Sequence, residues 1–210
     1  MKLPIIEPMK LSRLADAFDH PDFVFELKYD GFRCLTYISE SHCNLVSSRS
    51  SNQYKSFDSL KTALAKLKVK NAILDGEIVC LDSEGRSRLN LLLRHRAEPA
   101  LYAFDLLWLN GKDLRQLPLI ERKIRLRKLI EKSDCRRTIY VPHIGMRGCV
   151  LYRAICKKDL EGIVCKRKDG MYLVSGQWLI VLNPAYSQDS GRHEQFTAFR
   201  QGEGRVSRRK

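Results

Sequence analysis

Several features are missing from this sequence of 210 residues, and each absence narrows what the protein can be. No apolar run approaches the length of a transmembrane helix. Residues 1–10 are too short and too interrupted by proline for a secretory signal peptide. None of the seven cysteines forms a C-x-x-C pair, and their number is odd. We therefore expect reduced packing thiols in a cytoplasmic protein, and neither disulfides nor a zinc site.

Acidic residues are scarce relative to basic ones. The chain has 24 Asp and Glu against 38 Lys and Arg, which gives a formal net charge of +14. Such an excess favours a polyanionic partner, nucleic acid first, and disfavours a membrane because no basic amphipathic helix stands out. The hydrophobic content of 44% is typical of a globular protein, and the length suits one sizeable domain or two small ones.

Hydrophobic periodicity predicts short strands interleaved with helices after a lead-in over 1–20 that has at most one helical turn. The predicted strands are 23–29, 33–39, 43–47, 72–81, 101–109, 138–141, 162–166 and 177–182, and the predicted helices are 56–67, 89–96, 117–132 and 150–158. In the helix at 117–132 we assign the apolar side to Ile120, Ile124 and 126–130, with a dense basic face. A polar, basic composition from residue 185 predicts a domain over 1–184 and a flexible tail over 185–210.

The stretch FELKYDGFR, residues 25–33, would place charges on one face of a strand. Alternation puts Glu26, Lys28 and Asp30 on that face, with aromatic and leucine side chains on the other. Lys28 is then either one of several solvated charges or a nucleophile. A lysine amine attacks only when neutral, so a nucleophilic role needs burial or neighbouring cations to lower its pKa. The stretch alone leaves both interpretations open.

A second strand carries carboxylates inside an apolar run. In AILDGEIVCL, residues 72–81, Asp75 and Glu77 share one face on simple alternation. Burying two unpaired carboxylates would be costly. That cost favours a functional role for this strand.

Five motifs then occur in a fixed order: KYDGFR, SSRS, LDGEIV, YAFDLLWL and EGIVCKR. This set resembles the ATP-dependent DNA ligases of the covalent nucleotidyltransferase superfamily, and is most similar to bacterial ligases of the end-joining type. The resemblance covers about residues 8–183. It implies an α+β fold, in which antiparallel sheets flanked by helices surround a central nucleotide cleft, as in the nucleotidyltransferase (ATP-grasp-like) domain of ligases.

The resemblance also implies a reaction. In this family a lysine attacks the α-phosphate of ATP, forms lysyl–AMP and releases pyrophosphate. The AMP then passes to a DNA 5′-phosphate, and the nick is sealed in DNA repair or recombination. Mg²⁺ assists by neutralising phosphate charge. By resemblance Lys28 is the nucleophile, and the partner is nicked or broken double-stranded DNA.

The residues that would bind the nucleotide carry over position by position from the resemblance. Glu26 is placed to accept a hydrogen bond from the adenine amino group. Phe104 matches the aromatic residue that stacks on adenine, although without the motif order it would be taken for a core residue. Arg33 matches the arginine that contacts ribose, and Arg49 the one near phosphate.

Three further residues complete the site that the resemblance implies. Glu77 resembles the carboxylate near ribose and metal, and Glu161 resembles the carboxylate on the metal side. We therefore assign Mg²⁺ to these two glutamates. Lys166 falls where the fourth motif of the family has a basic residue, close to the nucleotide.

The sequence departs from the family pattern in one motif and in length. Where the family has W-x-K-x-K, this chain has Trp178-Leu179-Ile180-Val181-Leu182, so Ile180 and Leu182 replace two lysines that contact phosphate. Losing two charge-assisted contacts of roughly 1.5–3 kcal/mol each would leave adenylylation slow or absent. We also expect no OB-fold, the barrel that clamps DNA in family ligases, unless a protein partner supplies one.

Two alternative functions therefore stay open. One is a degenerate, non-catalytic protein that binds DNA ends through its basic surface. Ile180 and Leu182 favour it, whereas the retained Lys28, Glu77 and Glu161 disfavour it. The other is an RNA ligase or a capping-type nucleotidyltransferase that uses the same lysine chemistry.

Overall fold

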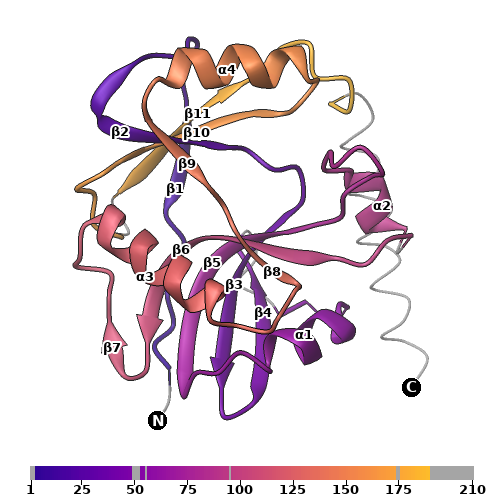
Figure 1. Cartoon of the computed structure of the whole chain (residues 1–210), viewed down its shortest axis with the longest axis vertical. Helices are drawn as coiled ribbons and strands as arrows, with labels where there is room; N and C mark the ends of the chain where they lie inside the picture. Colours follow the sequence, from indigo (N-terminus) through magenta and orange to yellow (C-terminus); the bar gives the residue numbers. More distant parts are fainter. Residues whose placement is uncertain (1–2, 49–52, 55, 95, 174–175, 190–210) are drawn as a thin grey trace.

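Two β-sheets form the framework of the protein, one in each half of Figure 1. The structure is a computed structural model that describes residues 3–48, 53–54, 56–94, 96–173 and 176–189. Neighbouring strands are antiparallel except for the pairs β1–β11 and β6–β8, which are parallel. The α+β fold with mostly antiparallel sheets is therefore confirmed. No helix in these ranges is long and apolar enough to cross a membrane.

The first sheet, called sheet A, has the strand order β1-β11-β10-β2-β9. Its strands are β1 (Lys10–Arg13), β2 (His20–Leu27), β9 (His143–Met146), β10 (Gly162–Arg167) and β11 (Gln177–Leu182). Helix α4 (Gly148–Lys157) covers its outer face in the upper half of Figure 1. Alternate strand residues point to this face, so Phe25, Ile163 and Val181 pack there against Ile155 of the helix. The opposite face is left free for the site.

The second sheet, called sheet B, has the order β4-β3-β5-β6-β7, with β8 beside β6. Its strands are β3 (Phe32–Ser39), β4 (His42–Ser47), β5 (Asn71–Val79), β6 (Ala100–Leu109), β7 (Lys112–Asp113) and β8 (Thr138–Tyr140). Helices α1 (Asp58–Leu64), α2 (Leu89–Leu93) and α3 (Leu119–Glu131) pack on one face around the largest hydrophobic cluster. On the other face, Leu35, Ile73 and Leu107 pack against Trp178 of sheet A. The two sheets therefore face each other across an apolar layer that also borders the site.

Tight two-residue turns connect neighbouring strands of sheet B. Glu40 and Ser41 both have positive φ, 50° and 65°, and connect β3 to β4 in a two-residue hairpin. Asn110 and Gly111, with φ of 49° and 89°, do the same between β6 and β7. These tight connections fix the register of the strands that carry Arg33 and Phe104.

The structure corrects three predictions about the elements. Residues 1–20 contain strand β1, and β9 was not predicted at all; both are short edge strands of sheet A. The helix predicted at 56–67 covers only Asp58–Leu64. On α3, the assigned apolar side is right for Leu126, which is buried, but wrong for Ile124, which is 50% exposed. Arg122 and Lys123 are 0% and 1% exposed, so the basic residues do not all lie on one exposed face.

The predicted boundary between domain and tail stays a prediction. Immediately beyond it, Tyr186 is buried and donates a hydrogen bond to Asp30 Oδ2 at 3.0 Å. Ser187 N–H donates to Asp159 Oδ1 at 2.8 Å. These residues pack on the domain. Residues 190–210, most of the predicted tail, lie outside the described residues.

Candidate active site

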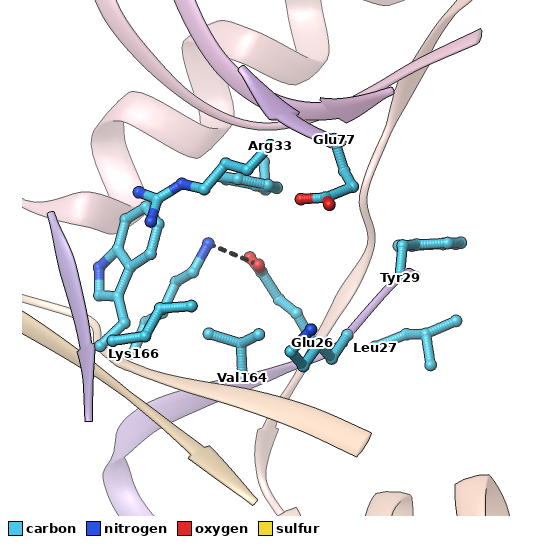
Figure 2. A pocket seen from close by; sticks show the side chains of 11 residues that line it. Glu26, Leu27, Tyr29, Arg33, Glu77, Val164 and Lys166 are labelled. Atoms are coloured by element: carbon cyan, nitrogen blue, oxygen red, sulfur yellow. Dashed lines mark ion pairs between the residues drawn. The ribbon is translucent and has the colours of Figure 1, made fainter. Parts of the chain in front are cut away.

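A small pocket lies between the facing sides of the two sheets (Figure 2). Its walls come from four strands of sheet A, three strands of sheet B and the loop after β2. The lining residues are Leu11, Glu26, Leu27, Lys28, Tyr29, Arg33, Glu77, Phe104, Val164, Lys166 and Trp178. Six of the seven described residues that the resemblance assigns to the site therefore meet in one pocket, namely Glu26, Lys28, Arg33, Glu77, Phe104 and Lys166. Glu161, the seventh, lies next to it, and its carboxylate contacts Lys28. Arg49 lies outside the described residues.

At the inner end of the pocket, one buried carboxylate lies between two buried lysines. Glu26 Oε2 is 2.6 Å from Lys166 Nζ of β10, the contact drawn in Figure 2, and Glu26 Oε1 is 2.5 Å from Lys123 Nζ of α3. All three side chains are at most 2% exposed. Burial would raise the pKa of Glu26, but the charges of Lys123 and Lys166 outweigh it and hold that pKa below its usual value. Glu26 is therefore a charged hydrogen-bond acceptor in a water-poor environment.

Two aromatic rings flank the Lys166 ammonium. Its Nζ lies 3.9 Å from the ring centroid of Trp178 and 4.3 Å from that of Phe104, within the range of cation–π attraction. The two rings meet edge to face, with centroids 5.6 Å apart. Burial lowers the pKa of Lys166 to about 8, although Glu26 acts in the opposite direction. The Lys166 ammonium therefore covers ring faces on which a flat ligand could otherwise stack.

The wall formed by sheet B is fixed by a bidentate ion pair. Arg33 Nε and Nη2 donate to the two carboxylate oxygens of Asp75 at 3.1 and 2.8 Å, and Nη1 donates to the Met9 carbonyl at 2.8 Å. Tyr172 donates to Asp75 Oδ2 at 2.7 Å. The Asp75 carboxylate raises the pKa of Arg33 against the opposing effect of burial. The Arg33 guanidinium is therefore held rigidly beside the aromatic rings.

At the outer end of the pocket, Lys28 meets the carboxylate of Glu161, the residue just before β10. Lys28 Nζ is 2.7 Å from Glu161 Oε1, and its side chain is 18% exposed. The Lys28 backbone N–H donates to the Gly162 carbonyl at 2.9 Å, which fixes the loop after β2 against the start of β10. Lys28 is thus the one pocket lysine that a ligand can reach from solvent without passing the aromatic rings.

Glu77 lies on β5 across from Lys28. Burial raises the pKa of Glu77 to about 8, the nearby Lys28 lowers it, and the Glu161 carboxylate raises it again. Two carboxylates that repel each other in this way favour a bound cation between them. Among the described residues no group of three or more His, Cys, Asp or Glu is placed to hold a metal ion. Glu77 and Glu161 still fit Mg²⁺, because this ion is usually held by one or two carboxylates, with water and substrate phosphates as the other ligands.

The glycine of the first motif is required by a close backbone approach. A side-chain carbon built at Gly31 would overlap the carbonyl oxygen of Ile78 on β5. Only glycine lets the loop after β2 pass so close to sheet B. This contact brings Lys28 and Glu77, on different sheets, to the same pocket.

The two apolar residues of the last motif border the same face of sheet A. Trp178 lines the pocket, and alternation along β11 puts Ile180 and Leu182 on its side of the sheet. Ile180 is paired in register with Val164, another lining residue, and Leu182 with Gly162. Both side chains are half-buried. Ile180 and Leu182 therefore lie on the pocket side of sheet A and present no charge to it.

Sequence reasoning missed two residues of the site. Lys123 was assigned to a solvated basic face, although its spacing from Leu119 and Leu126, four residues after one and three before the other, puts it on the buried face of α3. Trp178 was recognised only as a motif marker. The sequence signal that could have placed Trp178 in the pocket lining was its position in the predicted strand 177–182, which starts next to the pocket.

The comparisons with known proteins agree with this geometry. A sequence model of the ATP dependent DNA ligase domain matches residues 6–179, which is most of the chain. The chain belongs to the ATP-dependent DNA ligase domain family. Within this ligase family, the chain is 33% identical over 168 residues to the multifunctional non-homologous end joining protein LigD of Pseudomonas aeruginosa, a match that covers 78% of the chain and 20% of that relative.

Two further comparisons support membership of the ligase family. The DNA ligase of Pyrobaculum calidifontis is 30% identical over 194 residues, covering 81% of this chain and 33% of the relative. The structure of a mycobacterial DNA ligase D complexed with ATP and MES superposes with a TM-score of 0.73 and 25% identity, over 83% of this chain and 59% of that one. The chain thus spans a fifth to a third of the length of these two curated relatives.

Proposed function

We propose that this domain carries out the adenylyl-transfer chemistry of an ATP-dependent DNA ligase, with Lys28 as the nucleophile. The observation that supports this most strongly is the position of Lys28 at the outer end of the pocket. Its ammonium contacts Glu161, while Glu26 and two aromatic rings form the inner end. A nucleotide with its base at the inner end would present its phosphates to Lys28.

The inner end suits an adenine base. Phe104 and Trp178 offer ring faces for stacking, and Glu26 offers a charged acceptor for an amino group. Arg33, held by Asp75 beside the rings, would contact the ribose. The pocket volume is only about 50 Å³, whereas benzene occupies a cavity of roughly 150 Å³. A base can therefore enter only if a lining side chain moves, and Lys166 is the one that fills the space between the rings.

The proposed reaction forms a bond between Lys28 Nζ and the α-phosphorus of ATP and breaks the bond from that phosphorus to the bridging oxygen of pyrophosphate. Lys28 must lose a proton before it attacks, and Glu161 Oε1, 2.7 Å away, lies within reach to accept it. A Mg²⁺ ion held by Glu77 and Glu161 would neutralise charge on the phosphates. AMP would then pass from Lys28 to the 5′-phosphate of nicked or broken double-stranded DNA, which the net charge of +14 would attract.

The end of the site that would hold the phosphates of ATP is expected to bind them weakly. Ile180 and Leu182 face the cleft without charge, and we expect the first step, attack on ATP, to be slow for that reason. The same proposal includes a protein partner that would complete the binding of DNA. The same two residues support a second candidate function, a non-catalytic protein that binds DNA ends.

The test is the intact mass of the protein after incubation with ATP and Mg²⁺, with Lys28→Ala as the control. The proposal predicts a gain of one AMP in the parent protein and none in the variant. No gain in a folded parent would exclude self-adenylylation under those conditions. Sealing of pre-adenylylated nicked DNA, which bypasses the first step, would then separate a ligase from a protein that only binds DNA ends.

A further inference from the structure

The two lysines that contact Glu26 are held in different ways. One carboxylate with two ammonium groups leaves one uncompensated positive charge in a buried site. A ligand that needs the carboxylate must therefore displace one lysine, and the surroundings of each lysine show which one can leave.

Lys123 is locked in place. Besides Glu26 Oε1 at 2.5 Å, its Nζ donates to the Val141 carbonyl at 3.2 Å and to the Phe104 carbonyl at 3.4 Å. An ammonium group has three donors, so these three acceptors use its full capacity. Its neighbour Arg122 fixes the same turn of α3 through two hydrogen bonds to Asp105. Lys123 does not line the pocket.

Lys166 is held more loosely. In the described part of the chain its polar partner is Glu26 Oε2, and the rest of its ammonium faces the rings of Trp178 and Phe104. It lines the pocket, and Figure 2 shows its side chain extended through it toward Glu26. A flat ligand that stacks on one of these ring faces would take the place of the Lys166 ammonium and reach the same oxygen of Glu26.

We propose that Lys123 is a positioning residue for base recognition, which anchors Glu26 Oε1 from helix α3 so that Oε2 stays aimed into the pocket as the acceptor for a purine amino group. This inference rests on the proposed function. Lys166 is the cation that gives way when the base enters, and Lys123 remains as the counter-charge of the buried carboxylate.

The arrangement selects between purines. An ionised carboxylate only accepts hydrogen bonds, so it pairs with the 6-amino group of adenine and repels the 6-oxo group of guanine. A site built in this way discriminates strongly, because the wrong base leaves a buried polar group unpaired. Without Lys123, Glu26 loses its anchor. It can then turn away or take up a proton, and a protonated carboxyl group can donate to the 6-oxo group as well.

The experiment compares equilibrium binding of ATP and GTP by calorimetry, in a Lys28→Ala background that blocks covalent reaction. Lys123→Met is expected to lose roughly ten- to hundredfold of the preference for ATP over GTP. Lys123→Arg, which keeps the charge and the donors, is expected to retain most of the preference. The matched control is Lys128→Met, an exposed lysine on the same helix, which should leave the preference unchanged.

A loss of stability alone would lower the binding of both nucleotides together, whereas the proposed role changes their ratio. If Lys123→Met does not fold, Lys123→Gln is measured in its place and must show a reduced preference. An unchanged ATP-to-GTP ratio in either folded variant would overturn the role of Lys123 and leave the proposed function intact. If the Lys28→Ala protein binds neither nucleotide, the parent is tested in the same way, and no binding there would overturn both.

Discussion

The two ends of the pocket use charge in opposite ways. At the inner end, one carboxylate, Glu26, is shared by two lysines that are each 1% exposed. At the outer end, one lysine, Lys28, is surrounded by the carboxylates of Glu161 and Glu77. The inner end has an excess of positive charge and excludes water, while at the outer end the charge of Lys28 is balanced by Glu161 and the pocket is partly open.

This contrast shows where the domain is well equipped for a nucleotide and where it is not. The inner end offers rings and a fixed acceptor, as base recognition requires. Among the described residues, every cation that lines the pocket already contacts a carboxylate: Lys28 with Glu161, Arg33 with Asp75, and Lys166 with Glu26. A triphosphate must compete for these cations. Ile180 and Leu182, on the same side of sheet A, offer it no further charge.

The largest effect is expected from breaking the ion pair that supports the inner end. Arg122 and Asp105 are both 0% exposed and are joined by two hydrogen bonds of 2.8 Å. Replacing Arg122 by Met leaves Asp105 as a buried, unpaired charge, which costs about 3–5 kcal/mol. We expect Arg122→Met to lower the free energy of unfolding in urea by that amount.

An exposed ion pair on the same helix is the matched control. Arg127 Nε and Glu131 Oε1 are 2.7 Å apart, but the side chains are 65% and 57% exposed. Such a pair contributes about 0.3–0.5 kcal/mol, so Arg127→Met should have little effect. Equal losses in the two variants would contradict the view that burial of the Arg122–Asp105 pair makes the inner end rigid.

A smaller effect, visible as a dependence on pH, should come from Lys166. Burial lowers its pKa from the usual 10.5 to about 8. Between these values the unfolded chain keeps a proton that the folded protein has lost, so the free energy of unfolding should rise with pH. Below pH 8 both states are protonated and the full cost of burying the charge remains. We expect Lys166 to contribute a rise of roughly 3 kcal/mol across this window.

The measurement is the free energy of unfolding as a function of pH for the parent and for Lys166→Met. The difference between the two curves isolates the contribution of Lys166 to the free energy of unfolding from the contributions of the tyrosines and cysteines that titrate in the same range. Lys128→Met, which removes an exposed lysine, should follow the parent. Parallel curves for the parent and Lys166→Met would show that this lysine is not destabilised by burial.

The parts of the fold that could be predicted from the sequence are those with strong alternation or turn chemistry. Strands β5 and β6 and the Asn110-Gly111 turn follow directly from such patterns. The short strands β1 and β9 have four residues each and lie at the edges of sheet A, so no alternating pattern marks them. They form because β11 and β2 offer free edges, which is a tertiary effect.

The features of the site also divide into those that the sequence could predict and those that it could not. Four of the five motifs, KYDGFR, LDGEIV, YAFDLLWL and EGIVCKR, each contribute a residue that lines the pocket, because they lie on strands or loops that face it. The ion pairs among these residues could not be predicted, since Glu26 and Lys123 are 97 positions apart. Charge was also a misleading guide on α3, where a dense basic face was predicted but Arg122 and Lys123 are buried with carboxylate partners.

The measurement that tests this account most directly is the rate of Lys28 adenylylation in a single turnover, for the parent and for Ile180→Lys/Leu182→Lys. Because the account attributes a slow first step to missing cations at the outer end, it predicts a faster variant. A gain of about 1.4 kcal/mol in the transition state for each lysine corresponds to roughly tenfold each. A rate that stays unchanged or falls, in a folded variant that still binds ATP, would contradict the account.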